Sequence, residues 1–511
     1  MKANLGDLYS FRLLGGNYGV AQILATDHFA GADRVLLAPL DFYSAIPPMP
    51  SMVEGSSLCP QQTGRKNHGM EWVERTVPWW ASFIGNDRPR PLPMIPEKAY
   101  TGWGSAPRAL HDLRLDQSGR KTYDDKSRER ATISVNLGST TGTYKSGFDY
   151  GIETFPLMPA DGLPVDWSAL DALPGLVALD HRGADRGLSA WLSTQTRINV
   201  LTWREPEDAA IDLSATSLLH LLFADIDRPV TVSLPDSVIG LTLSGSTGQV
   251  TLKGPSFAEP FRLTLEGPNF AGIPQGLEDL RVIEFAKFRT LDLTPVSSLP
   301  HLAEIVIHDV PGGIANIGAL AALRELRDFS GIEIYGFDAK AFPAPPQASS
   351  LLEVYFSGLS TGDAKVLRRR LADVPTVSFD RVRSVAWLAA NADNPFRDWE
   401  DTYGSAGKGA GKLWRKALAA ARKAGKKPAK DDAHAIVKHF IDGLNEIDAF
   451  IIDDFRDEAW GAVHHLVHAS LSDALSPEET GDLIRHLVRA YWKDEVIDDE
   501  LATLIADLDD F

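Results

Sequence analysis

Apolar residues return at a nearly constant interval through the middle of the chain. In seven of the eight segments, a marker residue is followed two positions later by a second apolar residue; the register is unclear after Leu326. The marker is usually preceded, three positions earlier, by a third apolar residue. Successive markers are 20, 20, 22, 20, 22, 21 and 28 residues apart; they are Leu201, Leu221, Leu241, Leu263, Ile283, Ile305, Leu326 and Val354. A period of this length predicts a solenoid, in which each repeat supplies one short strand and stacked repeats bury a shared core.

The Leu-x-x-Leu-x-Leu template of these segments resembles the leucine-rich repeat family over residues 173–385. Where that family carries Asn or Cys, this chain has Pro206, Ile226, Ser246, Pro268, Phe288 and Val310, so the usual ladder from side chains to backbone amides is missing. A second apolar alternation follows in several repeats, at Ile211/Leu213, Val230/Val232, Val250/Leu252 and Leu291/Leu293. These pairs predict a back face that is richer in strands than usual.

The segments on either side of the repeats have a different character, and a chain of 511 residues is long enough for several domains. Residues 1–160 predict a β-rich N-terminal domain, because Tyr9, Phe11 and Leu13 alternate with the residues between them. Residues 170–390 predict the solenoid. Residues 395–511 predict an acidic, all-helical domain, preceded by a basic Gly/Lys segment. We interpret the glycine-rich run 404–412 of that segment as a flexible linker and Leu413–Lys426 as a basic helix. The expected fold class is therefore α+β and multidomain.

Charge is unevenly distributed along the chain, whose net charge is −18. Residues 404–430 carry nine Lys or Arg and no Asp or Glu, whereas residues 431–511 carry 21 Asp or Glu and five Lys or Arg. An acidic protein repels nucleic acid and anionic membranes and can attract a basic protein. Three interpretations of the charge split stay open: internal docking of the basic segment on the acidic helices, binding of a basic partner, and solubility alone.

Cysteine usage and hydropathy indicate a cytoplasmic protein. The single cysteine, Cys59, excludes an intramolecular disulfide and any zinc site with two or more thiolates. A free thiol suits a reducing compartment. The first residues lack the apolar stretch of a signal peptide, and no window of about 18 apolar residues predicts a membrane span.

Motifs that could support catalysis are all incomplete. The glycine-rich run 404–412 departs from the phosphate-loop pattern, because Leu413 stands where Ser or Thr is required. Cys59 with His68 could be a nucleophile and base, but no third orienting group is identifiable. Asp457, His464 and His468 would share one helix face and could bind zinc or iron.

The spacings Glu-x-x-His and His-Glu-x-x-His are nevertheless absent from the Asp/His cluster near residues 453–468. We therefore expect no catalytic residues, no bound metal, no cofactor and no enzymatic activity. A metal-dependent hydrolase that uses this cluster stays as an alternative.

Positions that alternate with the markers should project from one face of the repeat strands, because side chains alternate along a strand. Such a continuous face is the surface that solenoids offer to partners. The predicted partner-binding residues on it are Thr202, Arg204, His220, Thr242, Arg262, Thr264, Glu266, Glu284, Glu304, His308, Glu353 and Tyr355. The acidic candidates in the C-terminal domain are Asp453, Asp454, Asp457 and Glu458.

Residues 6–13 (GDLYSFRL) and 16–24 (GNYGVAQIL) carry a second resemblance. They are similar to the start of immunity protein family 26 of bacterial polymorphic toxin systems, which opens with Gly-Asp-x-Phe/Tyr and continues to a Tyr-Gly-x-x-x-Val/Ile-Leu strand. The resemblance implies a cytoplasmic protein that binds and blocks a toxin domain, which could be basic, by occlusion. The repeats and the acidic tail go beyond that family's pattern. A leucine-rich-repeat scaffold or signalling adaptor is the alternative non-enzymatic function.

Overall fold

A computed structural model of the chain divides into two compact units, Met1–Val382 and Arg383–Phe511. It describes residues 2–483 except 14–16, 30–31, 60–69, 76, 79–80, 92–102, 104–105, 107–109, 111–131, 139–140, 146–153, 158–164, 174–175, 177, 197, 255–256, 258–260, 309, 311–312, 347, 349, 392–393, 398, 426–427, 448–455, 468–470, 472–473, 477–478 and 481–482. The three-part division expected from the sequence stays a prediction.

The chain starts with a five-stranded antiparallel sheet whose order is β4-β3-β2-β1-β5. Tyr9, Phe11 and Leu13 are buried on one side of it, as their alternation predicts. Two of its strands lie in residues 46–110, where the abundance of Pro, Gly and Trp suggests loop-dominated structure. The elements are β1 (Asp7–Arg12), β2 (Tyr18–Phe29), β3 (Ala32–Pro39), α1 (Pro50–Val53), β4 (Glu71–Glu74) and β5 (Ser82–Asn86).

Asp7, which belongs to the Gly-Asp pair of the immunity-family resemblance, has a structural role in this sheet. Its carboxylate accepts hydrogen bonds from the backbone N–H of Asn4 at 2.8 Å, the Tyr9 hydroxyl at 3.1 Å and Asn86 Nδ2 at 3.0 Å. Burial, followed by the neighbouring Asp7 charge, raises the pKa of Tyr9, so the phenol stays a hydrogen-bond donor. The carboxylate therefore ties β1 to the turn before it and to β5.

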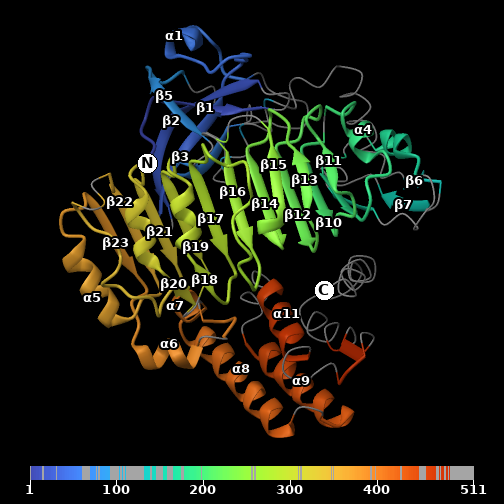
Figure 1. Ribbon diagram of the computed structural model, residues 1–511, viewed down its shortest axis with the longest axis vertical. Coiled ribbons are helices and arrows are strands. Elements are labelled where there is room, and N and C mark those ends of the chain that lie inside the picture. Colours follow the sequence, from blue (N-terminus) through green and yellow to red (C-terminus); the bar gives the residue numbers. More distant parts are fainter. Residues whose placement is uncertain are drawn as a thin grey trace. The chain divides into compact units, whose positions relative to one another are not determined.

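A long parallel sheet of 11 strands occupies the rest of the first unit, in the order β23-β22-β21-β19-β17-β16-β14-β12-β10-β9-β8 (Figure 1). Neighbouring strands follow one another along the chain, as in a solenoid. The strands are β8 (Thr154–Leu157), β9 (Ala178–Arg182), β10 (Val200–Arg204), β12 (His220–Ile226), β14 (Gly240–Gly245), β16 (Arg262–Glu266), β17 (Val282–Ala286), β19 (Glu304–His308), β21 (Asp328–Ile332), β22 (Glu353–Ser357) and β23 (Thr376–Asp380).

Strand register aligns the predicted markers from Leu201 to Ile305, and every one of them is buried. The next marker was wrong. Phe329, and not Leu326, pairs with Ile305 on one side and Val354 on the other. Leu326 is the buried residue three positions before the marker. The repeat lengthens here to 24 residues, and the apolar pattern alone places the marker three residues too early. The array also extends to Leu179 and Val377.

A residue in the left-handed conformation lies four positions after the marker, at or near the end of the strand, wherever that position is described. This conformation is present in every repeat whose residue at that position is described: Gly183, Glu205, Asp225, Gly245, Gly267, Lys287, Glu333, Gly358 and Arg381. In five repeats, the amide of this residue donates to a carbonyl of the next strand, as from Glu205 to Ala224 at 3.0 Å. At Gly245 a Cβ would lie 2.6 Å from the backbone N and O of Ile226, which requires glycine. The left-handed column that these residues form connects the ends of neighbouring strands through backbone hydrogen bonds. The side-chain Asn ladder of the leucine-rich repeat family is missing here.

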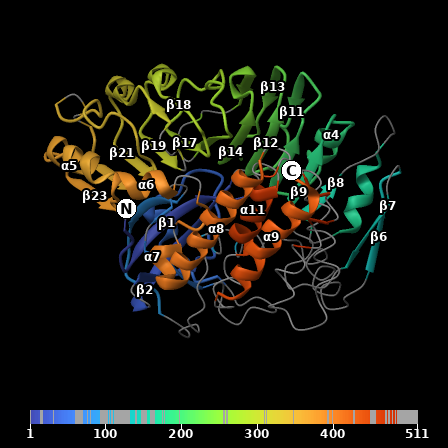
Figure 2. The same ribbon diagram turned by 90° about the horizontal axis from the view of Figure 1, so that it is seen from below.

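Short strands and 3-10 turns form the layer behind the long sheet, and Figure 2 shows β11, β13 and β18 on one side of the sheet strands. The pairs Ile211/Leu213, Val230/Val232, Val250/Leu252 and Leu291/Leu293 are buried here, as predicted. The described elements are β11 (Ala210–Asp212), β13 (Val230–Ser233), β15 (Val250–Lys253), β18 (Leu291–Asp292) and β20 (Ile314–Ala315), with η3 (Thr247–Gln249), η4 (Thr294–Ser298) and η5 (Ile317–Ala322).

Three further groups of elements flank the repeats. The hairpin β6 (Thr132–Asn136) and β7 (Thr141–Lys145) pairs antiparallel. The turn η2 (Trp167–Ala172) and helix α4 (Leu188–Leu192) bury Trp167, Leu170 and Leu188 in the core of the solenoid. At the other end, α5 (Thr361–Arg370) begins at Ser360, whose hydroxyl accepts from the Asp363 amide at 3.0 Å.

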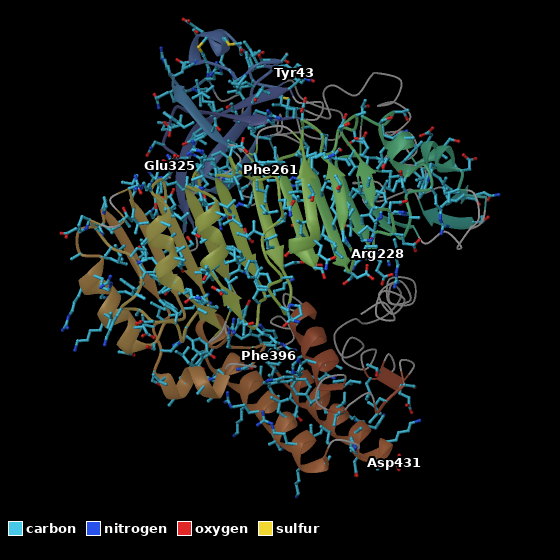
Figure 3. All side chains as sticks on the ribbon, viewed as in Figure 1. Tyr43, Arg228, Phe261, Glu325, Phe396 and Asp431 are labelled. Atoms are coloured by element: carbon cyan, nitrogen blue, oxygen red, sulfur yellow. The ribbon has the colours of Figure 1, made fainter. Side chains whose placement is uncertain are left out.

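The second unit contains α6 (Val385–Asn391), α7 (Trp399–Tyr403), α8 (Ser405–Ala424), α9 (Lys430–Asn445) and α11 (Arg456–His465). Its core includes Phe396, Trp414 and Phe440, with ring centroids of the last two 5.7 Å apart (Phe396 is labelled in Figure 3). The glycine-rich run 404–412 is not a flexible linker, because α8 begins at Ser405 and includes Gly407, Gly409 and Gly411. The basic helix predicted over Leu413–Lys426 forms the rest of α8 as far as Ala424. Gly407 and Gly411 are buried, so these glycines allow close packing rather than chain flexibility.

Candidate protein-binding face

The twelve predicted repeat residues all lie on one face of the long sheet. Their neighbours at the marker position and two positions later are buried, whereas these twelve are partly or fully exposed. The face is thus built by strand alternation. We call it the sheet face and define it by the positions one before, one after and three after each marker.

Register arranges the sheet face in straight columns. The residues one position after the marker pair directly with one another from strand to strand. They form a single column that contains hydroxyl, apolar and charged side chains. From β10 to β22 this column contains Thr202, Leu222, Thr242, Thr264, Glu284, Val306, Ser330 and Tyr355. Adjacent parallel strands lie about 4.8 Å apart. The column therefore gives a regular surface that is long enough to contact an extended segment of another polypeptide.

Four of the predicted residues join in one charged cluster at the middle of the face. Arg262 Nη1 lies 2.6 Å from Glu284 Oε2, and Arg262 Nη2 lies 2.6 Å from Glu304 Oε1. His308 Nε2 lies 2.9 Å from the other carboxylate oxygen of Glu284. The side chains are 15% exposed for Arg262, 20% for Glu284 and 27% for both Glu304 and His308. The cluster bridges β16, β17 and β19 and remains accessible.

Hydrogen bonding holds Glu284 in its ionised form. The bond with His308 is the main cause that lowers its pKa; Arg262 contributes through a second hydrogen bond and its charge, while partial burial opposes them. The cluster is consequently a set of fixed donors and acceptors at neutral pH. Partly shielded ion pairs of this kind hold side chains in one geometry more firmly than exposed pairs do.

Ion pairs also mark the edges of the face, where the left-handed residues contribute. Arg182 donates two hydrogen bonds to Glu205, at 2.8 and 2.6 Å, and Arg204 Nε lies 3.3 Å from Asp180 Oδ1. Lys287 Nζ lies 3.4 Å from Glu266. The same face as the central cluster also includes Thr202, Arg204 and His220, which belong to other repeats.

At the β22 end, Tyr355 is half-buried and Glu353 is exposed. Burial, followed by the charge of Asp380, raises the pKa of Tyr355, so its hydroxyl remains protonated at neutral pH. Amphipathic tyrosine is common in protein interfaces, where its ring packs and its hydroxyl finds a partner.

Sequence reasoning missed His181, which occupies the core position two after Leu179. The residue is 1% exposed; its ring packs edge-on against Trp203 at 4.9 Å, and Nε2 lies 2.9 Å from the Ala184 carbonyl oxygen. Burial lowers its pKa, with the Ala184 hydrogen bond opposing. The 22-residue spacing from Leu179 to Leu201 is the signal that could have identified this repeat.

The C-terminal candidates are placed only in part. Asp453, Asp454 and His468 lie outside the described residues, and α11 includes Asp457, Glu458 and His464, whose side chains are also outside the description. Among the described residues, no group of three His, Cys, Asp or Glu side chains could hold a metal ion. Of the Cys59/His68 pair, Cys59 is fully buried and His68 lies outside the described residues.

One described ion pair joins basic and acidic segments of the second unit. Lys430 Nζ, at the start of α9, lies 2.6 Å from Glu479 Oε1. The hydrogen bond from Lys430 is the main cause that lowers the pKa of Glu479 to about 2, followed by the bond from the Ser476 amide. Lys430 is exposed and Glu479 is half-buried. A pair at the surface contributes little to stability, so it orients the chain more than it stabilises it.

Comparisons with known proteins add little to this geometry. No known protein family and no curated protein matches the chain. Among solved structures, the chain is similar to an internalin from Listeria monocytogenes, with 18% identity, 43% of this chain and 73% of the internalin covered, and a TM-score of 0.20. The leucine-rich-repeat-like solenoid is therefore defined by its own strand register. Within the described residues, no helix is long and apolar enough to cross a membrane.

Proposed function

We propose that this chain is a protein-binding module without enzymatic activity, and that its partner polypeptide docks on the sheet face. The observation that carries the proposal is the charged cluster of Arg262, Glu284, Glu304 and His308, which sits accessible and already hydrogen-bonded at the middle of a register-matched face. Solenoids use such extended surfaces for binding. Side chains that are already ordered lose less conformational entropy when a partner arrives.

The composition of the face also favours a protein partner. Arginine and tyrosine are enriched among residues that dominate binding energy, and Arg262 and Tyr355 lie on the face with hydroxyl and apolar residues between them. A mixture of this kind suits a polypeptide, which brings both apolar side chains and backbone hydrogen-bonding groups.

A narrower form of the proposal is a toxin-neutralising, immunity-type role in the cytoplasm. Its support is the resemblance of residues 6–24 to immunity protein family 26 and the net charge of −18, which would attract a basic toxin domain. The mechanism would be steric occlusion of the toxin's working surface. A scaffold or signalling adaptor would use the same face with a different partner.

Two matched substitutions test the docking surface. Thr242→Arg places a long cation on β14 in the central column of the sheet face, whereas Thr251→Arg makes the same change on β15 in the back layer. Immobilised wild-type protein and both variants would capture partners from the host's lysate, identified by mass spectrometry. We expect a protein bound by the wild type and Thr251→Arg and lost with Thr242→Arg, at equal melting temperatures. Equal capture by all three would reject the sheet face as the docking surface.

The captured protein also separates the narrow and broad proposals. If it has a toxic activity, adding the full chain should suppress that activity in proportion to occupancy, and Thr242→Arg should not. If the captured protein keeps its activity when saturated, the occlusion mechanism fails while protein binding stands.

A further inference from the structure

A basic hollow lies on a part of the first unit that the sheet face does not use. It is formed by η5, the segment around Lys340 and the C-terminal end of α5, and its volume is about 580 Å³. Small residues, Gly318, Ala321 and Ala341, leave the space open, while Arg324, Lys340 and Arg370 contribute the charge. Among the described residues, no carboxylate lines it. Pockets of about 300–1,000 Å³ are the size that small ligands occupy.

The three cations are available to a ligand. Arg324 and Lys340 are exposed and make no side-chain hydrogen bond or ion pair with another described residue. Arg370 donates from Nε and Nη2 to the Phe342 carbonyl oxygen, at 3.0 and 2.9 Å, which fixes its guanidinium and leaves Nη1 for another acceptor. The hollow thus combines one oriented cation with two exposed ones.

Nearby carboxylates do not neutralise the hollow. Glu325, labelled in Figure 3, is next to Arg324 in sequence, but its carboxylate pairs with Arg281 and, at 2.9 Å, with His301. Asp338 accepts from the backbone amide of Lys340 at 3.0 Å and does not line the space. Three cations without a lining acid are unusual in a chain whose net charge is −18.

The charge is also not a periodic feature of the solenoid. Arg324 stands five positions before the marker Phe329, and the residue five before the preceding marker, Ile305, is Pro300. Residue types that recur in every repeat are explained by the stacking of the repeats. A group of cations that occurs once in the array is not explained in this way.

We propose that this hollow binds the phosphate group of a small phosphate-bearing ligand. A planar guanidinium donates in parallel to two oxygens of such a group, and a lysine ammonium adds a point charge. The two exposed side chains close around the anion, while Arg370 is already positioned. This site is independent of the proposed protein-binding function.

Calorimetric titration of the full chain with inorganic pyrophosphate, at low ionic strength, tests the site. We expect saturable 1:1 binding that weakens as salt rises, and at least about a tenfold loss of affinity in the double variant Arg324→Ala/Lys340→Ala. The matched control is Lys365→Ala/Arg369→Ala, which removes the same charge from exposed positions of α5 outside the hollow. Its affinity should stay within about twofold of the wild type, and all three proteins should melt alike.

Parallel titrations with inorganic phosphate and with a phosphorylated sugar show which kind of phosphate-bearing ligand the site prefers. Tighter binding of the sugar phosphate assigns the site to phosphorylated metabolites, and equal or tighter binding of the free anion assigns it to inorganic phosphates. Absence of saturable binding to every probe, or an equal loss in the control variant, would overturn the proposal.

Discussion

Arg262 and Glu304 are joined across an intervening strand: Arg262 Nη2 lies 2.6 Å from Glu304 Oε1, although β17 separates their strands in the sheet. The other arm of the guanidinium holds Glu284 on β17 itself. One side chain therefore couples three successive repeats on the face that we propose for binding.

Removing this guanidinium should leave two like charges without their shared partner. We expect Arg262→Met to lower the free energy of unfolding by about 1–3 kcal/mol, a range discounted for partial exposure. The pKa of Glu284 should rise but remain below its ordinary value, because His308 is the larger cause of its depression. Urea denaturation and a carbon-detected NMR titration of Glu284 would measure the two effects.

Arg228→Met is the control for that variant, because Arg228 pairs only with the adjacent, exposed Asp227 among the contacts described. It should change neither unfolding nor the Glu284 titration. If Arg262→Met leaves the Glu284 pKa unchanged, the cluster does not exist in solution as described.

Substitution by glycine should have opposite effects on stability at two exposed lysines, Lys287 and Lys253. Lys287 ends β17 at φ 61°, a conformation that costs a residue with a Cβ roughly 1–2 kcal/mol, whereas Lys253 lies in the extended strand β15. We expect Lys287→Gly to stabilise the first unit by about 0.5–1 kcal/mol, net of its weak pair with Glu266, and Lys253→Gly to destabilise it by a similar amount. Melting curves that shift in the same direction for both variants would contradict the left-handed column.

The solenoid could be predicted because its core positions recur at nearly equal intervals. Burial requires an apolar residue wherever a strand faces inward, so Leu241, Leu263 and Ile283 reveal the register directly. The prediction failed at Leu326, where the repeat length changes from 22 to 24 residues and two apolar residues, Leu326 and Phe329, compete for the marker position. A repeating pattern predicts the position of the next buried residue only while the repeat length stays constant.

The charged cluster was predicted only as separate residues. Arg262 and Glu304 are 42 positions apart, and nothing in their local sequence shows that they meet; the contact follows from register and from the reach of an arginine. The left-handed column was missed for a different reason. Glu205, Lys287 and Arg381 are not turn-forming residue types, so the backbone conformation is imposed by the stack and not by local preference.

As the pH falls, the buried His181 should lower the stability of the first unit at a higher pH than Glu284 does. Burial lowers the pKa of His181, so below the unfolded value of 6.5 the unfolded chain binds a proton that the folded chain does not. Stability should therefore fall as pH drops from 7 toward 5, by at most about 1.4 kcal/mol per pH unit for this group. The depressed Glu284 pKa gives a loss only below about 4.5.

His181→Phe should flatten the slope of unfolding free energy against pH between 7 and 5, because phenylalanine keeps the edge-on ring contacts with Trp167 and Trp203 and cannot titrate. Above pH 7.5 the variant and the wild type should run parallel, which serves as an internal control. Identical slopes in the acidic window would show that His181 is not buried as described.

The two glycines near the start of α8 should respond in opposite ways to alanine. Alanine favours a helix interior over glycine by about 0.8–1 kcal/mol, so propensity alone predicts stabilisation at both. At Gly409 the new Cβ would meet only Ile447 Cδ1, at 3.9 Å, and we expect a higher melting temperature for the second unit. At Gly407 the Cβ would overlap the carbonyl group of Trp399, which is backbone and cannot rotate away, so Gly407→Ala should lower that temperature. Circular dichroism of the full chain, followed with tryptophan fluorescence, would record both shifts. A flexible linker would give no difference between the two variants, because a chain without packing contacts responds to alanine equally at either position.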